Sequence, residues 1–201
     1  MSNLDSFRYV FIDNQVERTL FLFHGTGGNE NDFLFINDLL KHRYNLVGLR
    51  GNINENGMNR FFRRNTQGVY DQKNIKEETE KLTLFIKEFA KIHTQKIDDF
   101  TYLGYSNGAN ILLASLFYFP ESFKKLFLLH PMIPFMPSQS FKPKNHSIYL
   151  TYGLHDEMCP PEKTMQLIDI VRNRGVKVTV HSYESGHEIT QMELSDVVSA
   201  L

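Results

Sequence analysis

Gly104-Tyr105-Ser106-Asn107-Gly108 is the most informative segment of the sequence. It lies between the apolar, β-rich run Phe100–Tyr105 and the apolar stretch Ala109–Phe119, which is typical of a strand that turns sharply into a helix. Small residues two positions before and after a serine let strand and helix approach closely, so that the hydroxyl projects from a strained turn. The G-x-S-x-G pattern in this context predicts that Ser106 is an activated nucleophile. A plain Ser-Asn-Gly turn or helix cap is the alternative.

Outward from this segment, apolar runs alternate with helical patterns along most of the chain. We expect strands at Phe7–Ile12, Arg18–His24, Tyr44–Leu49, Phe100–Tyr105, Lys125–His130, Ser147–Tyr152 and Val176–Val180. We expect helices at Ile75–His93, Ala109–Phe119, Glu162–Arg174 and Glu188–Leu201. Most of the strands are apolar on both faces, which is typical of parallel strands covered by helices. The last strand alternates more cleanly, so we expect it near one side of the sheet. The order predicts an α/β fold with a mostly parallel central sheet and helices on both faces.

A glycine-rich segment, His24-Gly25-Thr26-Gly27-Gly28, follows an early apolar strand. An elbow serine needs two backbone N–H donors for the oxyanion, one from the residue after it and one from such a loop. We assign these donors to Asn107 and Thr26. The segment is not a Walker loop, because no Gly-Lys-Ser/Thr follows, and Glu30 occupies the place of the third glycine in G-x-G-x-x-G. A plain glycine-rich turn is the alternative.

A serine hydroxyl needs a general base and a third group that orients the base. After an elbow serine, the acid comes next in the chain and the histidine comes last. Asp156 lies in the loop after Ser147–Tyr152, and His187 lies in the loop after Val176–Val180. Because the carboxyl ends of parallel strands meet at one edge of a sheet, we expect Asp156 to orient His187 beside Ser106.

Other titratable side chains are weaker candidates. Glu157 adjoins Asp156 but is expected to point elsewhere, and His181 is at a strand end, typical of a surface or packing residue. Asp98 and Asp99 precede a strand and so lie at the wrong end of the sheet.

No metal or cofactor is expected. A metal site of His24, His155 and His187 is conceivable on composition, but no metal-ligand spacing supports it. Cys159 lies in a Met-Cys-Pro-Pro segment rather than on an elbow, so we expect a packed core cysteine instead of a nucleophile.

The composition excludes several classes of protein. The 201 residues carry 22 Lys+Arg and 23 Asp+Glu, a net charge of −1, which argues against a dedicated nucleic-acid binder. One cysteine permits no intrachain disulfide, and no secretory signal is visible. The longest apolar stretch, Ala109–Phe119, is far shorter than the ~18–20 residues that span a bilayer, so no stable membrane insertion is expected. We expect a single cytoplasmic domain over residues 1–201.

Together these segments resemble the α/β-hydrolase superfamily, and more closely the small bacterial carboxylesterase/phospholipase group related to acyl-protein thioesterases. The resemblance covers essentially the whole chain and is carried by His24–Gly28, Leu49–Gly51, Gly104–Asn110, Gly153–Asp156 and Ser185–His187. The loop Arg50–Arg64 is similar to predicted esterases of this group that are associated with quinone stress. The resemblance implies a serine hydrolase without cofactor, acting on carboxylic esters or thioesters and often forming a homodimer.

One departure concerns the segment after the acid. The group's usual Asp-x-x-Val-Pro reads Asp156-Glu157-Met158-Cys159-Pro160 here, and cysteine for valine keeps the volume modest, so the acid assignment survives. No large lid insertion is apparent. Two irregular stretches, Gly51–Gln72 and Pro131–Asn145, follow strand ends and are candidate pocket walls.

The substrate pocket is harder to predict than the catalytic triad of Ser106, Asp156 and His187. Its candidate residues are Arg50, Phe61, Phe62, Met132 and Phe135. The apolar ones fit core residues or a dimer patch equally well, and the arginines of Arg50–Arg64 favour a solvated or salt-bridged loop over an acid-binding site. We expect a small-molecule ester substrate with a small or short-to-medium acyl group. A thioesterase or lysophospholipase with the same triad is the alternative, and a non-catalytic or slow ligand receptor on this fold is another.

Overall fold

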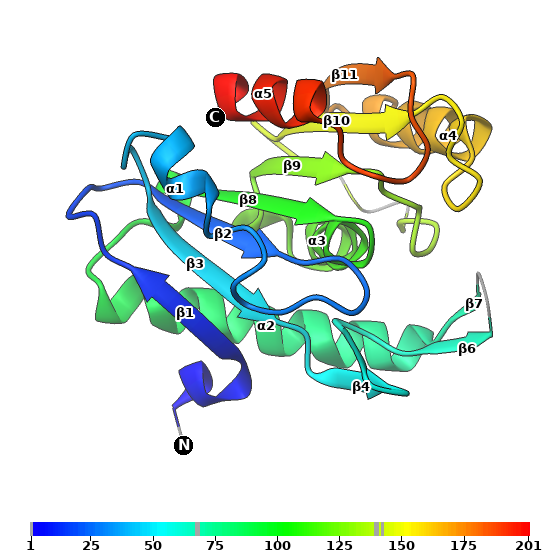
Figure 1. The fold of residues 1–201 in the computed structure, drawn as a ribbon. Coiled ribbons are helices and arrows are strands. Elements are labelled where there is room, and N and C mark those ends of the chain that lie inside the picture. Colours follow the sequence, from blue (N-terminus) through cyan, green and yellow to red (C-terminus); the bar gives the residue numbers. More distant parts are fainter. Residues whose placement is uncertain (1, 67–68, 139–140, 142) are drawn as a thin grey trace.

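A seven-stranded sheet forms the centre of the protein in the computed structural model, which describes residues 2–66, 69–138, 141 and 143–201 (Figure 1). The strand order is β1-β3-β2-β8-β9-β10-β11. β1 runs antiparallel to β3, and the other neighbouring pairs are parallel. The strands are β1 (Arg8–Ile12), β2 (Thr19–Phe23), β3 (Asn45–Arg50), β8 (Phe100–Tyr105), β9 (Lys125–Leu129), β10 (Ser147–Gly153) and β11 (Lys177–Tyr183). The predicted mostly parallel sheet is confirmed, and β11 lies at its edge as expected.

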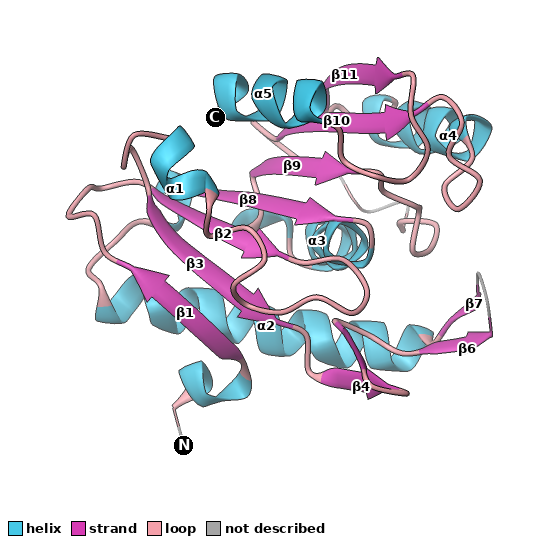
Figure 2. Ribbon diagram, viewed as in Figure 1, coloured by secondary structure: helices cyan, strands magenta, loops and turns pink. Residues whose placement is uncertain are grey.

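Helices cover both faces of the sheet (Figure 2). Buried residues of α2, α3 and α4 share one hydrophobic cluster, and those of α1 and α5 share a second cluster on the opposite face. The helices are α1 (Ile36–Leu39), α2 (Gln72–Ile92), α3 (Asn107–Tyr118), α4 (Pro161–Arg172) and α5 (Gln191–Ala200). Short 3-10 turns occupy Asn3–Ser6, Ile97–Asp99 and Pro120–Ser122.

The central strands supply both clusters. In β2, Phe21 and Phe23 face the cluster under α2 and α3, whereas Leu20 and Leu22 face the cluster under α1 and α5. Successive side chains of a strand point to opposite faces, so a strand between two helical layers must be apolar at every position. This is why these runs read as continuously apolar in the sequence.

Local hydrogen bonds set the helix ends, and they differ from the prediction by a few residues. α2 begins at Gln72 because the Asp71 side chain accepts a hydrogen bond from the Asn74 backbone N–H at 3.0 Å. α5 begins at Gln191 because Thr190 and Glu193 form a reciprocal capping box. α3 ends at Tyr118 because the next residue, Phe119, precedes Pro120, and a residue before a proline disfavours the helical conformation.

The stretch Gly51–Gln72, expected to be irregular, contains two small hairpins. They pair β4 (Ile53–Glu55) with β5 (Met58–Arg60), and β6 (Arg64–Thr66) with β7 (Val69–Tyr70). The first turn holds Asn56 and Gly57 at φ angles of 54° and 85°, the conformation that an Asn-Gly hairpin turn needs. The strands are short and polar, so they lack the apolar alternation that would have revealed them. Residues 67–68 of this stretch lie outside the described residues.

The other irregular stretch, Pro131–Asn145, carries neither helix nor strand in its described part, and residues 139–140 and 142 lie outside that part. Within the described chain, every helix is too short or too polar to cross a lipid bilayer.

Candidate active site

Ser106 stands at the turn between β8 and α3 in a strained backbone conformation. Its φ and ψ angles are 51° and −113°, a region that costs a residue with a side chain about 1–3 kcal/mol. Both flanking glycines are needed for this turn. A Cβ on Gly104 would lie 2.6 Å from the carbonyl carbon of Gly108, and a Cβ on Gly108 would lie 2.3 Å from the Phe23 carbonyl oxygen. Close packing of β8, β2 and α3 thus presents the serine hydroxyl at the carboxyl end of the sheet.

The imidazole of His187 lies between Ser106 and Asp156. Its Nε2 is 2.9 Å from Ser106 Oγ, and its Nδ1 is 2.8 Å from Asp156 Oδ2. Asp156 follows β10 and His187 follows β11, so three strand ends bring the side chains to one edge of the sheet. Tyr105 donates its hydroxyl to the His187 carbonyl oxygen at 2.7 Å, which fixes the loop that carries the imidazole.

Asp156 is buried, and hydrogen bonds saturate its carboxylate. Oδ1 accepts from the backbone N–H groups of Met158 and Cys159 at 2.9 and 2.8 Å. Burial alone would raise the pKa of Asp156, but the Cys159 N–H and the imidazoles of His187 and His130 together lower this pKa below its ordinary value. The group is therefore a carboxylate at neutral pH.

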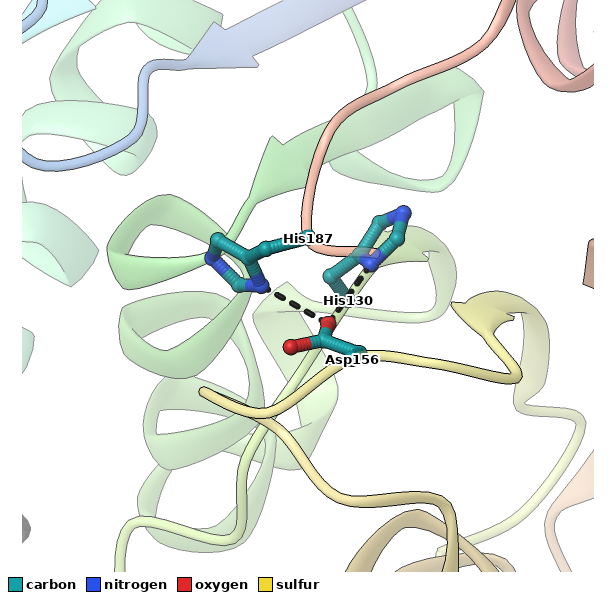
Figure 3. A group of neighbouring side chains, drawn as sticks. All are labelled: His130, Asp156 and His187. Atoms are coloured by element: carbon teal, nitrogen blue, oxygen red, sulfur yellow. Dashed lines mark hydrogen bonds and ion pairs between the residues drawn. The ribbon is translucent and has the colours of Figure 1, made fainter. Parts of the chain in front are cut away.

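A second histidine, to which no motif of the sequence points, also contacts Asp156 (Figure 3). His130 Nδ1 lies 2.9 Å from the same Oδ2 atom that His187 contacts. Its Nε2 lies 3.3 Å from Oε2 of Glu193 on α5. The sequence feature that could have pointed to His130 is its position directly after β9, which lies between the strands that lead to Ser106 and Asp156.

The loop after β2 is held by the β4–β5 hairpin. Gly27 N–H donates to the Asn59 carbonyl at 2.9 Å, and Arg60 Nη1 donates to Thr26 Oγ1 at 2.7 Å. His24 Nε2 accepts from the Gly51 N–H at 3.0 Å. Burial lowers the pKa of His24, which suits a neutral ring that accepts a hydrogen bond. The histidine of this loop is thus a structural residue.

Asn107 opens α3 and links it to the hairpins. Its Oδ1 accepts from the Phe61 N–H at 2.7 Å, and its buried Nδ2 has no hydrogen-bond partner in the described chain. The first backbone N–H groups of a helix have no partner within the helix and carry the positive end of its dipole. The Asn107 N–H therefore belongs to a part of the site that favours negative charge.

A cavity of about 310 Å³ opens in front of the serine and histidine. Its walls come from the loop after β2, the hairpins, α3 and the segments after β9 and β10. The lining residues are Thr26, Arg60, Arg64, Tyr70, Ser106, Asn107, Asn110, Met132, Glu157, Met158, Cys159 and His187. Met132 lies in the wall, as expected.

The structure corrects the other four pocket residues. Arg50 points away and donates to Glu30, with Nη2 3.0 Å from Oε1. Phe61 and Phe62 are 1% and 0% exposed, because both pack into the hydrophobic cluster shared with α2 and α3 rather than into the cavity wall. Phe135 packs against aromatic rings of α3. Instead of these residues, Tyr70, Arg60 and Arg64 line the cavity.

Of the weaker candidates, Glu157 lines the cavity instead of pointing elsewhere, whereas the two histidines have other surroundings. His155 is exposed and pairs with Glu184 at 2.9 Å, and His181 stacks on Tyr149 with ring centroids 4.9 Å apart. Cys159 is 3% exposed, and burial raises the pKa of its thiol well above the ordinary value. The expectation of a packed cysteine is confirmed, although the residue also forms part of the cavity wall.

Within the described residues, one group has possible metal ligands within 4.8 Å of one another: His130, Asp156 and His187. The metal site considered from the sequence is not assembled, since neither His24 nor His155 belongs to this group. Both histidine Nδ1 atoms lie at hydrogen-bond distance from one carboxylate oxygen, so N–H groups rather than free lone pairs face Asp156. The group fits a hydrogen-bonded network better than a metal centre.

Comparisons with known proteins agree with this geometry. The chain matches the phospholipase/carboxylesterase family over residues 9–201. It is 34% identical over 186 residues to a Bacillus subtilis (strain 168) protein named "Putative hydrolase MhqD", covering 92% of this chain and 93% of that protein.

Solved structures of carboxylesterases are also similar. The Bacillus cereus carboxylesterase matches with a TM-score of 0.91 and 32% identity, covering 100% of this chain and 98% of that one. The Mesorhizobium loti carboxylesterase matches with a TM-score of 0.90 and 27% identity, covering 97% and 94%. The chain is a carboxylesterase-type hydrolase with the α/β-hydrolase fold, and it belongs to the phospholipase/carboxylesterase family.

Proposed function

We propose that the protein is a serine esterase that hydrolyses carboxylic esters through Ser106, His187 and Asp156 and an acyl-enzyme. The observation that carries this proposal is the position of one imidazole, with Nε2 2.9 Å from a strained serine hydroxyl and Nδ1 2.8 Å from a buried carboxylate. When Nδ1–H donates to Asp156, Nε2 is left to accept the serine proton. Nucleophile, base and orienting acid are then all present in one hydrogen-bonded line.

In the first half of the reaction, Ser106 Oγ forms a bond to the acyl carbon while His187 takes the hydroxyl proton. Asp156 stabilises the imidazolium that results. The tetrahedral intermediate then collapses, the bond to the alcohol oxygen breaks, and His187 gives its proton to that oxygen. In the second half, water attacks the acyl-enzyme with His187 as base, which releases the acid and restores Ser106.

The backbone N–H groups of Thr26 and Asn107 would bind the oxyanion. Both residues line the cavity beside Ser106. The Asn107 group lies at the positive end of α3, and hydrogen bonds to the hairpin hold the loop of Thr26. Such preorganised donors lower the barrier because they need no rearrangement when charge develops.

The cavity supports a small or short-to-medium acyl group. Its volume of about 310 Å³ is at the low end for ligand pockets, and Met132, Met158 and Tyr70 supply apolar contact. Thioesters and lysophospholipids place the same demands on the triad, so they are the alternative substrates. A slow or non-catalytic ligand receptor, the alternative from another class, would have no use for a strained serine held against a base.

The experiment compares wild type with Ser106→Ala on p-nitrophenyl esters of increasing acyl length, together with labelling by a fluorophosphonate probe. We expect the variant to lose turnover and labelling and to keep its melting temperature. Ser195→Ala, on the exposed side of α5, is the matched control and should behave as wild type. Most of the activity persisting in Ser106→Ala would reject the proposal, and a wild type that the probe does not label would favour the receptor. Thioester analogues with the same acyl groups then separate esterase from thioesterase.

A further inference from the structure

His130 follows β9 in a strained conformation, fully enclosed by the protein. Its φ angle is 50°, in the left-handed region that costs a residue with a side chain about 1–2 kcal/mol, and its exposed fraction is 0%. Its backbone N–H donates to the Thr151 carbonyl at 2.9 Å, and its carbonyl accepts from Cys159 Sγ at 3.3 Å. A strained conformation persists only where the surroundings strongly determine it, and it is concentrated at functional sites.

Both ring nitrogens of His130 face a carboxylate. Nδ1 is 2.9 Å from Asp156 Oδ2, and Nε2 is 3.3 Å from Glu193 Oε2. An ionised carboxylate accepts hydrogen bonds and donates none, so each nitrogen needs its own proton. A neutral imidazole has only one N–H. Glu193 Oε1 in turn accepts the Thr151 hydroxyl at 2.6 Å, and Oε2 accepts the Thr190 N–H at 3.4 Å, so both carboxylate oxygens act as acceptors. The arrangement therefore fits an imidazolium between two carboxylates.

The other groups around the ring come from three further elements. Tyr105 of β8 meets it edge-on at a centroid distance of 5.9 Å, and the His187 ring lies at 5.3 Å. The Cys159 thiol touches its carbonyl, and Glu188 adds a weaker negative field. Burial would lower the pKa of His130, but the hydrogen bonds to Glu193 and Asp156 outweigh burial and raise this pKa above its ordinary value.

We propose that His130 is a positioning residue: held as an imidazolium between Asp156 and Glu193, it fixes the orienting carboxylate and opposes premature protonation of His187. The role rests on the proposed function, because the proton affinity of His187 governs a rate only if His187 is the catalytic base.

Charge balance explains why a second imidazole is useful. Asp156 and Glu193 together bring two negative charges into a buried region, and the proton on His130 cancels one of them. The remaining single negative charge is neutralised when His187 takes the serine proton. The two carboxylates and two imidazoles together then carry no net charge in the transition state. Without the charge on His130, the negative charge of the two carboxylates would be uncompensated, which favours the protonated form of His187, so this base would become free only at higher pH.

The first test measures the charge directly. Two-bond ¹H–¹⁵N NMR correlations of histidine-labelled wild-type protein distinguish imidazolium from either neutral tautomer, and the spectrum of His130→Gln assigns the His130 signals. We expect both ring nitrogens of His130 to be protonated at about pH 7, above the ordinary pKa of 6.5, where a free imidazole is mostly neutral. A neutral His130 ring at that pH would overturn the proposal.

The second test measures the consequence. Glutamine at position 130 keeps one donor but carries no charge, so we expect the acidic limb of kcat/KM to move to higher pH by about one unit, the size of shift that one nearby charge produces. His155→Gln, in an exposed pair with Glu184, is the matched control and should leave the profile unchanged. A uniform loss of kcat in His130→Gln with an unmoved acidic limb would indicate a merely structural residue and contradict the proposal.

A second variant covers the case in which His130→Gln does not fold. Glu193→Gln removes one of the two carboxylates, so the NMR titration of His130 should move to lower pH than in wild type, and an unmoved titration would contradict the proposal. If His130→Gln does not fold, correlations between each imidazole ring and its own backbone in uniformly labelled protein assign the His130 signals in wild type and in Glu193→Gln. The NMR measurement needs no turnover. A wild-type chain that hydrolyses no ester would defeat the proposed esterase function, whereas the protonation of His130 would still be decided separately.

Discussion

Arg60 donates through Nη1 to Oγ1 of Thr26 at 2.7 Å, and this hydrogen bond ties the β4–β5 hairpin to the loop after β2. The Arg60 side chain is 7% exposed and lies 3.6 Å from the Glu55 carboxylate. A buried guanidinium with a fixed counter-ion has little freedom, so its hydrogen bond restrains Thr26. The backbone N–H assigned to the oxyanion thus depends on a side chain 34 positions further along the chain.

We therefore predict that Arg60→Gln and Thr26→Val each lower kcat by about 3- to 10-fold, the equivalent of one lost hydrogen bond. The double variant should be little worse than either single one, because both remove the same contact. Arg63→Gln, an exposed neighbour outside the cavity, is the control of equal charge change and should leave kcat unaltered. Steady-state kinetics on one short p-nitrophenyl ester measure kcat for all four variants. Fully additive losses of kcat in the double variant would refute the coupling between Arg60 and Thr26.

The elbow glycines yield a prediction about stability. Gly104→Ala and Gly108→Ala introduce a Cβ at 2.6 and 2.3 Å from backbone atoms, which cannot move as a side chain can. Each change should lower the free energy of unfolding by about 1–3 kcal/mol or more and the melting temperature by several degrees. Gly57→Ala is the control, since its new Cβ would meet no atom within 4 Å and adds only the strain of a positive φ. Urea unfolding should rank Gly57→Ala as the mildest, and equal losses at all three positions would contradict steric crowding at the elbow.

The fold was predictable because its signals are local. The parallel strands between the two helical layers are buried on both faces and mostly apolar, as β2 and β8 are, and the position of Ser106 between a strand and a helix follows from five consecutive residues. The loop positions of Asp156 and His187 follow from the same rule about the carboxyl ends of parallel strands. Sequence spacing was therefore enough to bring three distant side chains to one edge of the sheet.

The cavity wall was less predictable, because it depends on which way a hairpin folds. Phe61 and Phe62 are apolar in a loop near the site, yet they complete the core, and the polar residues Arg60 and Arg64 face the cavity instead. Glu193 and His130 could not be paired from the sequence, since 63 positions separate them and the capping box of Glu193 says nothing about a contact with β9. Contacts between side chains on different elements require the packing of those elements to be known.

Asp156→Asn should reduce kcat by about 10³- to 10⁴-fold, the loss typical when the orienting acid of a triad becomes an amide. The amide N–H₂ cannot accept from His187 Nδ1–H, so the imidazole loses the tautomer that leaves Nε2 free. The fold should survive, because Oδ1 can still accept from the N–H groups of Met158 and Cys159.

Asp98→Asn is the control for this change, since Asp98 is paired with Lys124 at 2.7 Å at the opposite end of the sheet. Its kcat should equal that of wild type. Rates for both variants come from the same ester assay, with circular dichroism as the test of folding. A loss below tenfold in Asp156→Asn would mean that another group orients His187.

The buried network also predicts how stability depends on pH. The folded pKa of Asp156 is lowered, so its contribution is present above its ordinary value of 3.8 and is lost as the pH falls through the folded value. The folded pKa of His130 is raised, so its contribution is present below its ordinary value of 6.5 and is lost as the pH rises through the folded value. The free energy of unfolding contributed by these two groups should therefore be largest between about pH 4 and pH 6.5.

Urea unfolding in steps from about pH 3 to pH 8 measures this dependence and separates the two groups. His130→Gln should abolish the part of the alkaline decline that His130 causes and leave the acidic decline, because Asp156 is still a carboxylate held by backbone N–H groups. Asp156→Asn should remove the part of the acidic decline that Asp156 causes, since an amide does not titrate. His155→Gln, whose imidazole is exposed, should retain both slopes. An alkaline decline of equal steepness in wild type and His130→Gln would mean that folding does not raise the pKa of His130, and the charge stabilisation assigned to it would be wrong.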